Sequence, residues 1–504
     1  MHNYLRTILL TAAALACAAL PPARASAAPQ RPNIIFILVD DLRWTAPSCM
    51  WAAGESGQPF AKTPNIDRIA AEGCKFSNAF VTTSLCSPSR ASFLTGLFVH
   101  SHRVLGNGNN NELSHKLITW PMMLHDAGYE TSWVGKWHMG TDPTPRPGFD
   151  HWMALPGQGQ YINPRFNVDG KDTTVQGYVT DILNARALEF IKARHDKPFL
   201  LYLSHKAVHG PFTPAEKYKD LYDNVAYEHR PNAKGDLSQD LEEKPALRRA
   251  ESERPNQAPK KKGKKKAAEA EANPNAIKGK NAFEQPNGRG DQLIKNQLRC
   301  VASIDDGVGM IFKALAETGQ LDNTLIAFSS DNGYLWGEHK LGDKRAAYEE
   351  SIRIPLMMRY PPMIKPGSTI DAYALNIDVA PTMTELAQAK PIPNVQGRSL
   401  LPLLKDPKNA PADWRKAVFL EYFAERGFPK IPTYQAARTE SWKLIHYPDL
   451  KEMDELYNLT QDPYEKHNLL YGPKKEPNTE MESLLNDLIQ QTGAAKAGGA
   501  PTQP

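Results

Sequence analysis

The sequence Pro32-Asn-Ile-Ile-Phe-Ile-Leu-Val39, followed at once by Asp40-Asp41, decides the fold. The run is short and apolar, and its β-branched residues favour a strand buried on both faces, as in a parallel sheet. Two later runs have the same character, at residues 197–203 and 324–329. Helical patterns lie between the strands, at residues 65–71, 119–127, 179–194 and 296–317. Strands that alternate with helices in this way predict an α/β domain whose sheet is covered on both sides.

Polar side chains follow the predicted strands, at the edge where α/β sheets bind ligands. Asp40 and Asp41 follow the first strand, and Asp331 and Asn332 follow the strand at residues 324–329. These four side chains offer only oxygen atoms, which suits a hard cation such as Ca²⁺ or Mg²⁺. Each pair alone could instead be a helix cap or a turn. Because both pairs lie at strand ends, the sequence favours a metal site.

A cysteine motif lies at residues 83–96, with the sequence Thr-Ser-Leu-Cys-Ser-Pro-Ser-Arg-Ala-Ser-Phe-Leu-Thr-Gly. Pro88 suits the first turn of a helix, and Gly96 is placed to end that helix. Cys86 is therefore expected just before a helix N-terminus, where free N–H groups favour an anion. Arg90 lies about one turn further along the same face, so a reactive group and a permanent cation meet at one site. The alternative is a buried structural cysteine beside a helix cap.

Length and composition bound the class of protein. The chain has 504 residues, of which 41% are hydrophobic and 23% charged, as in ordinary globular proteins. Residues 1–27 are typical of a secretory signal peptide, because an apolar stretch precedes the cleavage signal Ala25-Ser26-Ala27. No later stretch is apolar for long enough to span a membrane. The mature protein is therefore expected to be exported, to the periplasm or the medium.

The cysteines that remain after removal of the signal peptide are Cys49, Cys74, Cys86 and Cys300. If Cys86 is chemically modified, the other three permit at most one disulfide. The sequence leaves open whether that disulfide forms.

Residues 226–292 differ in composition from the rest of the chain. Pro, Glu, Lys and Asn dominate, and residues 260–266 contain six lysines and one glycine. This composition predicts a disordered insertion, with a basic tether to an anionic glycan or cell surface as the alternative. The net charge of the chain is +4, and six of its positive charges lie in this run. The remainder is near neutral, so a broad basic face for nucleic acid is not expected.

The C-terminal part of the chain has a different pattern from residues 30–385, which are expected to form the main domain and to end near a helix at residues 377–382. Short antiparallel strands are predicted at residues 418–423, 435–438, 442–446 and 454–457. They indicate a small α+β subdomain over residues 386–472. Residues 493–504 are rich in Ala, Gly and Pro and are expected to form a disordered tail.

Six motifs occur in the order found in type I sulfatases, the formylglycine-dependent members of the alkaline phosphatase-like superfamily. They are Asp40-Asp41, Cys86-Ser-Pro-Ser-Arg90, Gly135-Lys-Trp-His138, Lys206-Ala-Val-His209, Ser330-Asp-Asn-Gly333 and Gly342-Asp-Lys344. The chain resembles that family from residue 32 to about residue 470, with the lysine-rich insertion as the main interruption. The resemblance implies a large mixed, mostly parallel sheet flanked by helices, a small C-terminal antiparallel sheet, and hydrolysis of sulfate esters.

The resemblance also implies the chemistry. A formylglycine-generating maturase would oxidise Cys86 to 3-oxoalanine, and the metal would be one Ca²⁺ ion rather than Mg²⁺. One hydroxyl of the hydrated aldehyde would attack sulfur and form a covalent sulfo-enzyme intermediate. The second hydroxyl would then lose its proton and expel sulfate.

The roles of the remaining motif residues follow from the same resemblance. His138 would take the proton from the hydrated aldehyde, and Arg90 would hold its oxygens and balance the carboxylates. Lys136, Lys344 and His209 would surround the sulfate. His209 or Lys344 would protonate the leaving group. The histidines expected to be merely solvated are His100, His102, His205 and His339.

The expected substrate is a sulfated glycan, because exported sulfatases commonly resemble glycan-specific members of the family. Small aryl sulfates are an alternative, and so are phosphate or phosphonate monoesters, since relatives that cleave them share the cysteine motif and metal cradle. A catalytically silent glycan-binding protein is a third possibility, which the complete set of motif residues opposes. Loops at residues 106–111, 158–165 and 425–434 are expected to contact the organic part of the substrate.

Overall fold

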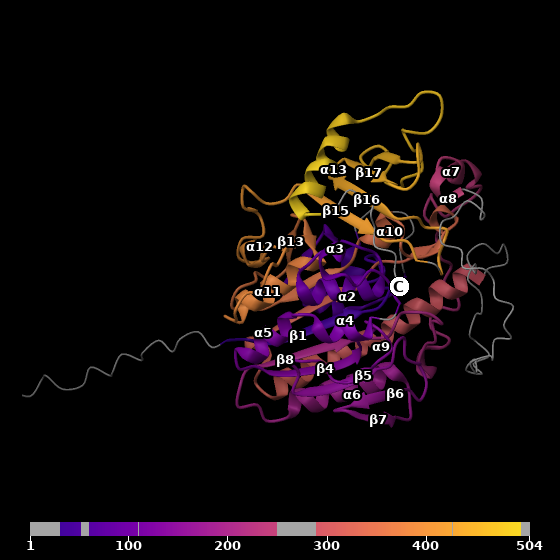
Figure 1. The fold of residues 1–504 in the computed structure, drawn as a ribbon. Coiled ribbons are helices and arrows are strands. Elements are labelled where there is room, and N and C mark those ends of the chain that lie inside the picture. The colour runs from indigo at the N-terminus through magenta and orange to yellow at the C-terminus, as the bar shows by residue number, and fades with distance from the viewer. Residues whose placement is uncertain (1–30, 52–59, 109, 249–288, 426, 495–504) are drawn as a thin grey trace, which may run out of the picture. The chain divides into compact units, whose positions relative to one another are not determined.

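The computed structural model describes residues 31–51, 60–108, 110–248, 289–425 and 427–494 (Figure 1). The predicted signal peptide, the lysine run at residues 260–266 and the tail from residue 495 onward lie outside these ranges. Residues from Pro32 onward form one unit. None of the described helices is long and apolar enough to cross a membrane.

The strand predicted at residues 32–39 is β1, and it lies near the middle of a ten-stranded sheet. The strands of this sheet, from edge to edge, are β13 (Ser368–Ile370), β2 (Cys74–Phe76), β12 (Leu356–Arg359), β9 (Thr324–Ser330), β1 (Asn33–Val39), β8 (Phe199–Ser204), β4 (Glu130–Lys136), β5 (His151–Leu155), β6 (Arg165–Val168) and β7 (Lys171–Thr174). From β9 to β5 all neighbours are parallel, whereas β12, β6 and β7 run antiparallel to their neighbours. The predicted mixed, mostly parallel sheet is therefore confirmed.

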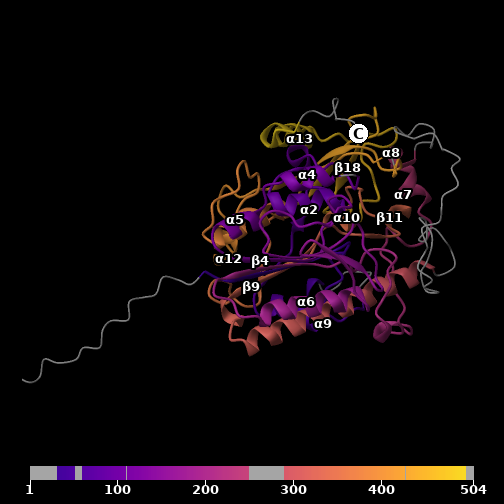
Figure 2. The ribbon, with the colours of Figure 1, turned by 60° about the horizontal axis from the view of Figure 1, so that its bottom comes forward.

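Helices cover both faces of the sheet, because the side chains of β1 alternate between two cores. Ile37 points into a core formed with α1 (Pro64–Ala71), α6 (Val179–Lys192) and α9 (Arg289–Glu317). Its neighbour Phe36 points into a core formed with α2 (Cys86–Thr95), α5 (Trp120–Asp126) and α11 (Val379–Leu386). Figure 2 shows α6 and α9 on one side of the sheet and α2 and α5 on the other. Each fully buried side chain of this size contributes about 2 kcal/mol of hydrophobic stabilisation.

Helix α2 begins at Cys86 itself, whereas the sequence places this residue just before the helix. Gly96 ends α2 as predicted, with a φ of 70° that a residue with a Cβ rarely adopts. Every residue of α2 is buried, including Arg90. The cysteine motif is therefore held inside the protein rather than on a surface turn.

Gly135 lets β4 approach β8 closely. Its φ is 120°, and a Cβ at this position would lie 1.8 Å from the carbonyl oxygen of Ser204. Only glycine fits this approach, which brings the end of β4 beside the end of β8. The motif residues Lys136 and His138 follow directly, so the glycine fixes where they enter the site.

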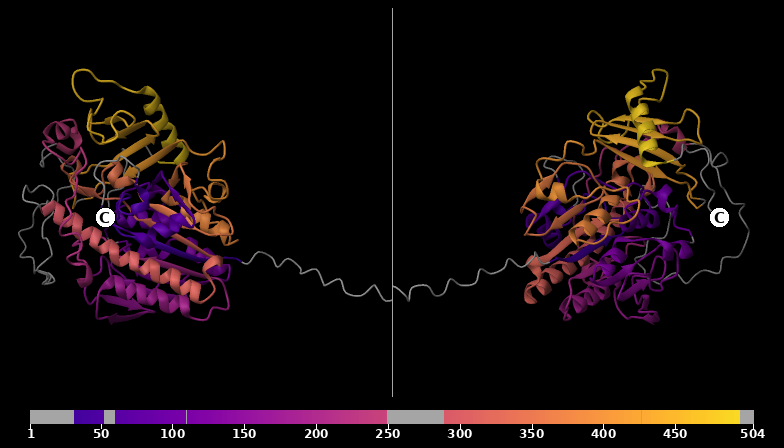
Figure 3. Two further views of the ribbon diagram at one scale, coloured as in Figure 1. Left: turned by 180° about the vertical axis from the view of Figure 1, so that it is seen from behind. Right: turned by 60° about the vertical axis from the view of Figure 1, so that its left-hand side comes forward.

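The four C-terminal strands are confirmed as an antiparallel sheet (Figure 3). They are β15 (Ala417–Tyr422), β16 (Tyr434–Thr439), β17 (Trp442–His446) and β18 (Glu455–Asn458). Helix α13 (Thr479–Thr492) packs against this sheet, so the C-terminal structure extends past residue 472, the limit set from the sequence. The sheet also shares a core with Phe80, Leu85 and Phe98, and it is therefore anchored on the main domain.

The predicted disordered insertion over residues 226–292 is too wide. Helices α7 (Ser238–Glu242) and α8 (Pro245–Arg248) lie within it, and α9 begins at Arg289. Lys244 is fully buried, and its ammonium donates to Asp240 Oδ1 at 2.9 Å and to the carbonyl of Glu465 at 2.8 Å. The polar composition of residues 226–248 therefore reflects partners inside the protein, which composition alone does not reveal.

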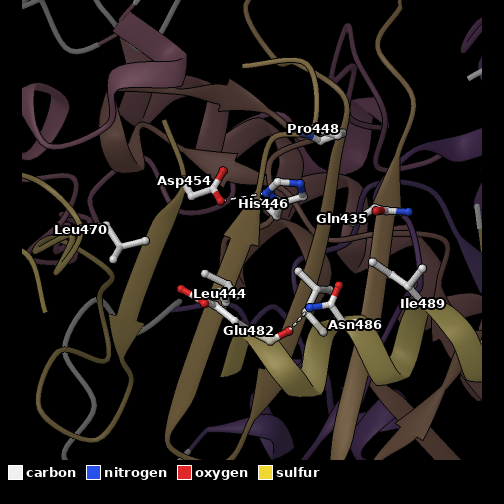
Figure 4. Close-up of a pocket in the computed structure, with 10 residues that line it drawn as sticks. Gln435, Leu444, His446, Pro448, Asp454, Leu470, Glu482, Asn486 and Ile489 are labelled. Atoms are coloured by element: carbon white, nitrogen blue, oxygen red, sulfur yellow. Dashed lines mark hydrogen bonds and ion pairs between the residues drawn. The ribbon is translucent and has the colours of Figure 1, made fainter. Parts of the chain in front are cut away.

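A cavity of about 350 Å³ lies between α13 and the C-terminal sheet (Figure 4). At its rim, His446 Nδ1 lies 2.8 Å from Asp454 Oδ2. β16 presents Gln435 to this cavity, whereas the hydroxyl of the preceding residue, Tyr434, donates to the carbonyl of Arg345 at 2.9 Å. Successive side chains of a strand point to opposite faces, so the cavity lies on the face of the sheet that is turned away from Arg345.

Candidate functional site

The four predicted metal ligands come together at the carboxyl ends of β1 and β9. The backbone N–H of Asp41 donates to Asp331 Oδ1 at 3.0 Å, and Asn332 Nδ2 donates to Asp41 Oδ1 at 2.7 Å. Asp40 continues from β1 beside them. All four residues are at most 1% exposed.

The donor set fits a hard divalent cation. Asp40 Oδ1 and Asn332 Oδ1 are buried and have no hydrogen-bond partner among the described residues. Burial and the neighbouring charge of Asp40 raise the pKa of Asp331 to about 7. Unpartnered carboxylate and amide oxygens are what a bound Ca²⁺ or Mg²⁺ would satisfy.

Cys86 lies at the edge of this acidic cluster. Its Sγ is 3.9 Å from Asp41 Oδ1, and the ligand atoms of Cys86, Asp40 and Asp331 lie within 4.8 Å of one another. Burial raises the pKa of the Cys86 thiol above its usual range, so the unmodified side chain is a neutral thiol and a poor nucleophile. Unmodified Cys86 is thus close to the proposed metal ligands, but its side chain is not a ready nucleophile.

Arg90 connects the cysteine helix to the acidic cluster. Its Nε donates to Asp331 Oδ2 at 2.8 Å, and its Nη1 donates to Ser204 Oγ at 2.7 Å and to the carbonyl of Lys136 at 2.9 Å. Although burial opposes the charge, Asp331 and Asp40 raise the pKa of Arg90. The guanidinium therefore stays charged and holds α2, β4, β8 and β9 in one arrangement.

Lys136 and Lys344 neutralise the two aspartates that follow β1. Lys136 Nζ forms an ion pair with Asp40 Oδ2, and Lys344 Nζ donates to Asp41 Oδ1 at 2.5 Å and Oδ2 at 2.6 Å. Although burial favours the neutral acid, Lys136 and the other nearby cations hold the pKa of Asp40 well below its usual range. Burial likewise opposes the charge of Lys344, but Asp41 raises its pKa. Lys344 thus keeps its charge, and both lysine side chains lie where the family resemblance places the sulfate.

His138 and His209 lie beside the same charges. His138 is 6% exposed, and its Nδ1 has no hydrogen-bond partner among the described residues. His209 Nδ1 donates to the carbonyl of Gly210 at 2.9 Å, which leaves Nε2 free to face Asp41 Oδ2 at 3.8 Å. Burial and the charge of Lys136 lower the pKa of both imidazoles, so both are neutral in this structure. Each can accept a proton and later return it.

The prediction that four other histidines are solvated is wrong. His102, His205 and His339 are at most 4% exposed. His339 Nδ1 lies 3.0 Å from Asp240 Oδ2, and burial lowers the pKa of His205 to about 3. The side chain of His100 is 13% exposed and binds Glu421. Sequence cannot place such residues, because their partners lie far away along the chain.

Sequence reasoning also missed residues that support the site. Gln158 Oε1 accepts a hydrogen bond from Lys136 Nζ at 2.6 Å, and Asn107 Oδ1 accepts one from the backbone N–H of Ser87 at 3.0 Å. Glu425 Oε1 accepts from the backbone N–H of Asn107 at 3.0 Å, and its Oε2 accepts from Arg345 at 2.7 Å. These residues lie in or beside the loops expected to contact substrate, and no spacing rule identifies them as partners of the site.

Family comparisons cover nearly all of the described chain. Residues 32–389 match the family model described as Sulfatase, and residues 337–492 match N-sulphoglucosamine sulphohydrolase, C-terminal. A curated relative from Bacteroides thetaiotaomicron, N-acetylglucosamine-6-O-sulfatase, is 34% identical over 522 residues, covering 96% of this chain and 90% of the relative.

Solved structures give the same result. One protein, solved in complex with its substrate D-glucosamine-2-N,6-O-disulfate, is 31% identical with a TM-score of 0.79, covering 93% of this chain and 100% of that chain. Phosphonate monoester hydrolase of Agrobacterium radiobacter has a TM-score of 0.71 at 20% identity, covering 92% of this chain and 96% of that chain. The second likeness concerns the fold alone.

Proposed function

Because the chain belongs to the sulfatase family, and is therefore a sulfate ester hydrolase, we propose that it removes the 6-O-sulfate of glucosamine or N-acetylglucosamine residues in sulfated glycans. The observation that carries the mechanism is the position of Cys86, beside buried carboxylates and among the cations Arg90, Lys136 and Lys344. The choice of sugar is supported by the curated relative and by the solved complex with a glucosamine disulfate.

Asp40, Asp41, Asp331 and Asn332 would hold one divalent cation, for which the family resemblance favours calcium. When bound, the ion would supply positive charge that lowers the pKa of an attacking hydroxyl and polarises the sulfate. The hydroxyl would come from hydrated 3-oxoalanine at position 86, formed from Cys86 by a formylglycine-generating maturase. The unpartnered oxygens of Asp40 and Asn332 support this arrangement.

The remaining residues would bind the anion and move protons. With a cation on the carboxylates, the ammonium groups of Lys136 and Lys344 could bind sulfate oxygens instead of balancing Asp40 and Asp41. His138 would accept the proton of the attacking hydroxyl, and His209 or Lys344 would protonate the leaving oxygen. Arg90 would hold residue 86 at a fixed distance from the carboxylates, because Arg90 lies in the same helix as residue 86 and binds Asp331.

Export is part of the proposal. It rests on the signal-peptide pattern of residues 1–27, and the expected location is the periplasm or the medium. A sulfated polymer is too large and too charged to cross a membrane freely, so a glycan-specific sulfatase needs to meet its substrate outside the cytoplasm.

The experiment compares three ester classes on protein purified from its native producer. We expect release of inorganic sulfate from N-acetylglucosamine-6-sulfate, with phosphate and phosphonate esters turned over at least about 100-fold less efficiently. The Cys86→Ala variant is the matched control and should release no sulfate. Preference for a phosphonate or phosphate ester would contradict the proposal and identify a phosphoryl hydrolase; binding of glycan without turnover would identify a binding protein.

A further inference from the structure

The loop that joins β5 to β6 reaches behind the site through one fully buried aromatic side chain, Tyr161. Its hydroxyl donates to the main-chain carbonyl of His209 at 2.6 Å. The ammonium of Lys206 lies 4.8 Å from the centre of its ring. Tyr161 thus contacts both ends of the segment from Lys206 to His209, although it is 48 residues away from His209 in the sequence.

The position of the His209 main chain decides where its imidazole lies. The ring is oriented by the hydrogen bond from Nδ1 to the carbonyl of Gly210, so it is fixed relative to its own backbone. The backbone of His209 is in turn held in place by the residues that bind its carbonyl group. Among the described residues, the carbonyl of His209 accepts one hydrogen bond besides that of Tyr161, a long one from the N–H of Phe212 at 3.4 Å. The hydroxyl of Tyr161 is therefore the stronger restraint on this carbonyl.

Tyr161 remains a hydrogen-bond donor at any ordinary pH. Burial and neighbouring groups, Cys300 first among them, raise its pKa well above the usual value for a phenol. A phenylalanine would keep the packing of the ring and remove only the donor. The carbonyl of His209 would then be left with the long bond alone, and the imidazole could shift by a fraction of an ångström.

We propose that Tyr161 is a positioning residue, which acts through the backbone of His209 to place imidazole Nε2 where the leaving oxygen of the sulfate ester takes its proton. This step uses the imidazolium form of His209, in which Nδ1–H still donates to the carbonyl of Gly210 and Nε2 carries a second proton taken up from solvent. When the S–O bond to the sugar breaks, the leaving oxygen keeps the electron pair and receives this second proton, which returns His209 to the neutral form. The inference rests on the proposed function.

The test uses the mature enzyme with N-acetylglucosamine-6-sulfate as substrate. We expect Tyr161→Phe to lower kcat about tenfold and to leave KM, the melting temperature and the modification of Cys86 unchanged. Tyr178→Phe is the matched control, because its ring stacks on Tyr161 with centroids 5.9 Å apart and its hydroxyl donates to the carbonyl of Thr213 at 3.0 Å. This control should stay within about twofold of the wild type.

A double-mutant cycle separates positioning from general structural support. In a His209→Ala background the carbonyl and its hydrogen bond remain but the imidazole is gone, so Tyr161→Phe should cause no further loss of kcat. A second tenfold loss in that background, or equal losses in Tyr161→Phe and Tyr178→Phe, would overturn the inference. Wild-type enzyme that carries the modified Cys86 but releases no sulfate would instead overturn the proposed function, and this inference with it.

Discussion

Arg90 Nε donates to Asp331 Oδ2 at 2.8 Å, and this pair joins the helix that carries Cys86 to the strand end that carries two of the proposed metal ligands. Both side chains are at most 1% exposed. A buried pair of this kind gives little net stability relative to apolar residues, but the loss of one partner leaves the other charge buried and unpaired. The Arg90–Asp331 pair instead fixes geometry, because it holds Cys86 at a set distance from the carboxylates.

Substitution of Arg90 by lysine tests this role. Lysine keeps the charge but cannot reach Asp331, Ser204 and the Lys136 carbonyl at once, because it lacks the planar fork of donors. We expect Arg90→Lys to lower kcat at least about 100-fold and the free energy of unfolding by about 2–3 kcal/mol. Arg186→Lys is the control, because this half-buried arginine of α6 makes only a surface ion pair with Glu189, and its change should stay below about 0.5 kcal/mol. Urea unfolding and sulfate release measure both effects; wild-type activity in Arg90→Lys would contradict the role.

Removal of divalent cations tests the metal site. Enzyme dialysed against EGTA should lose sulfate release, and added Ca²⁺ should restore it and raise the melting temperature. At about 100 times Kd, a ligand that binds only the folded state adds about 2.7 kcal/mol to stability. The Asn332→Ala variant should need more Ca²⁺ for the same shift, because it lacks one of the two unpartnered oxygens that the proposed metal ligands offer. Full activity in EGTA, or a melting temperature that ignores Ca²⁺, would exclude a functional metal at these residues.

Gln158 tests whether the loop between β5 and β6 supports the anion site. Its Oε1 is 2.6 Å from Lys136 Nζ, so it helps to place that ammonium. We expect Gln158→Ala to lower kcat/KM by about fivefold to tenfold while the melting temperature stays unchanged. Gln461, exposed on a turn after β18 and outside the loops expected to contact substrate, provides the control, and Gln461→Ala should match the wild type. Equal effects of the two substitutions on kcat/KM would show that the contact between Gln158 and Lys136 does not contribute to activity.

His100 makes the stability depend on pH. Its Nδ1 lies 2.9 Å from Glu421 Oε1 and its Nε2 lies 3.0 Å from the carbonyl of Thr492, so it connects α3 (Val99–His102) to β15 and α13. Burial opposes its charge, but the hydrogen bond and charge of Glu421 raise its pKa above the ordinary value. A raised pKa in the folded state means that this stabilisation is complete below about pH 6.5 and is lost as the pH rises through the folded-state pKa.

The expected result is therefore a larger difference in melting temperature between wild type and His100→Gln at about pH 6 than at about pH 8.5. Glu421→Gln removes the partner that raises the pKa and should abolish the same pH dependence. Parallel melting curves for wild type and His100→Gln across this range would show that His100 is not protonated in the folded protein.

Local sequence predicted the elements whose pattern is complete within a short stretch. The apolar run of β1, the end of α2 at Gly96 and the four C-terminal strands all follow from residues close together in the chain. The convergence of Asp40 with Asp331 was also predictable, because the carboxyl ends of adjacent parallel strands meet at one edge of a sheet.

The rest depends on contacts between distant residues. Lys244 looked solvated in a polar stretch, but Asp240 and the carbonyl of Glu465 bind it inside the protein. Gln158 and Tyr161 carry no motif, and only the fold shows that they touch Lys136 and His209. Propensity and spacing report on a residue's own segment, whereas these roles are set by which segments pack together.

The most direct test of the account is the mass of the peptide that contains Cys86, taken from protein purified from its native producer. A loss of about 18 Da relative to the cysteine peptide, the difference between a thiol and an aldehyde, is the predicted result, because the buried neutral thiol is a poor nucleophile. An unmodified thiol in enzyme that nevertheless releases sulfate from N-acetylglucosamine-6-sulfate would contradict the account.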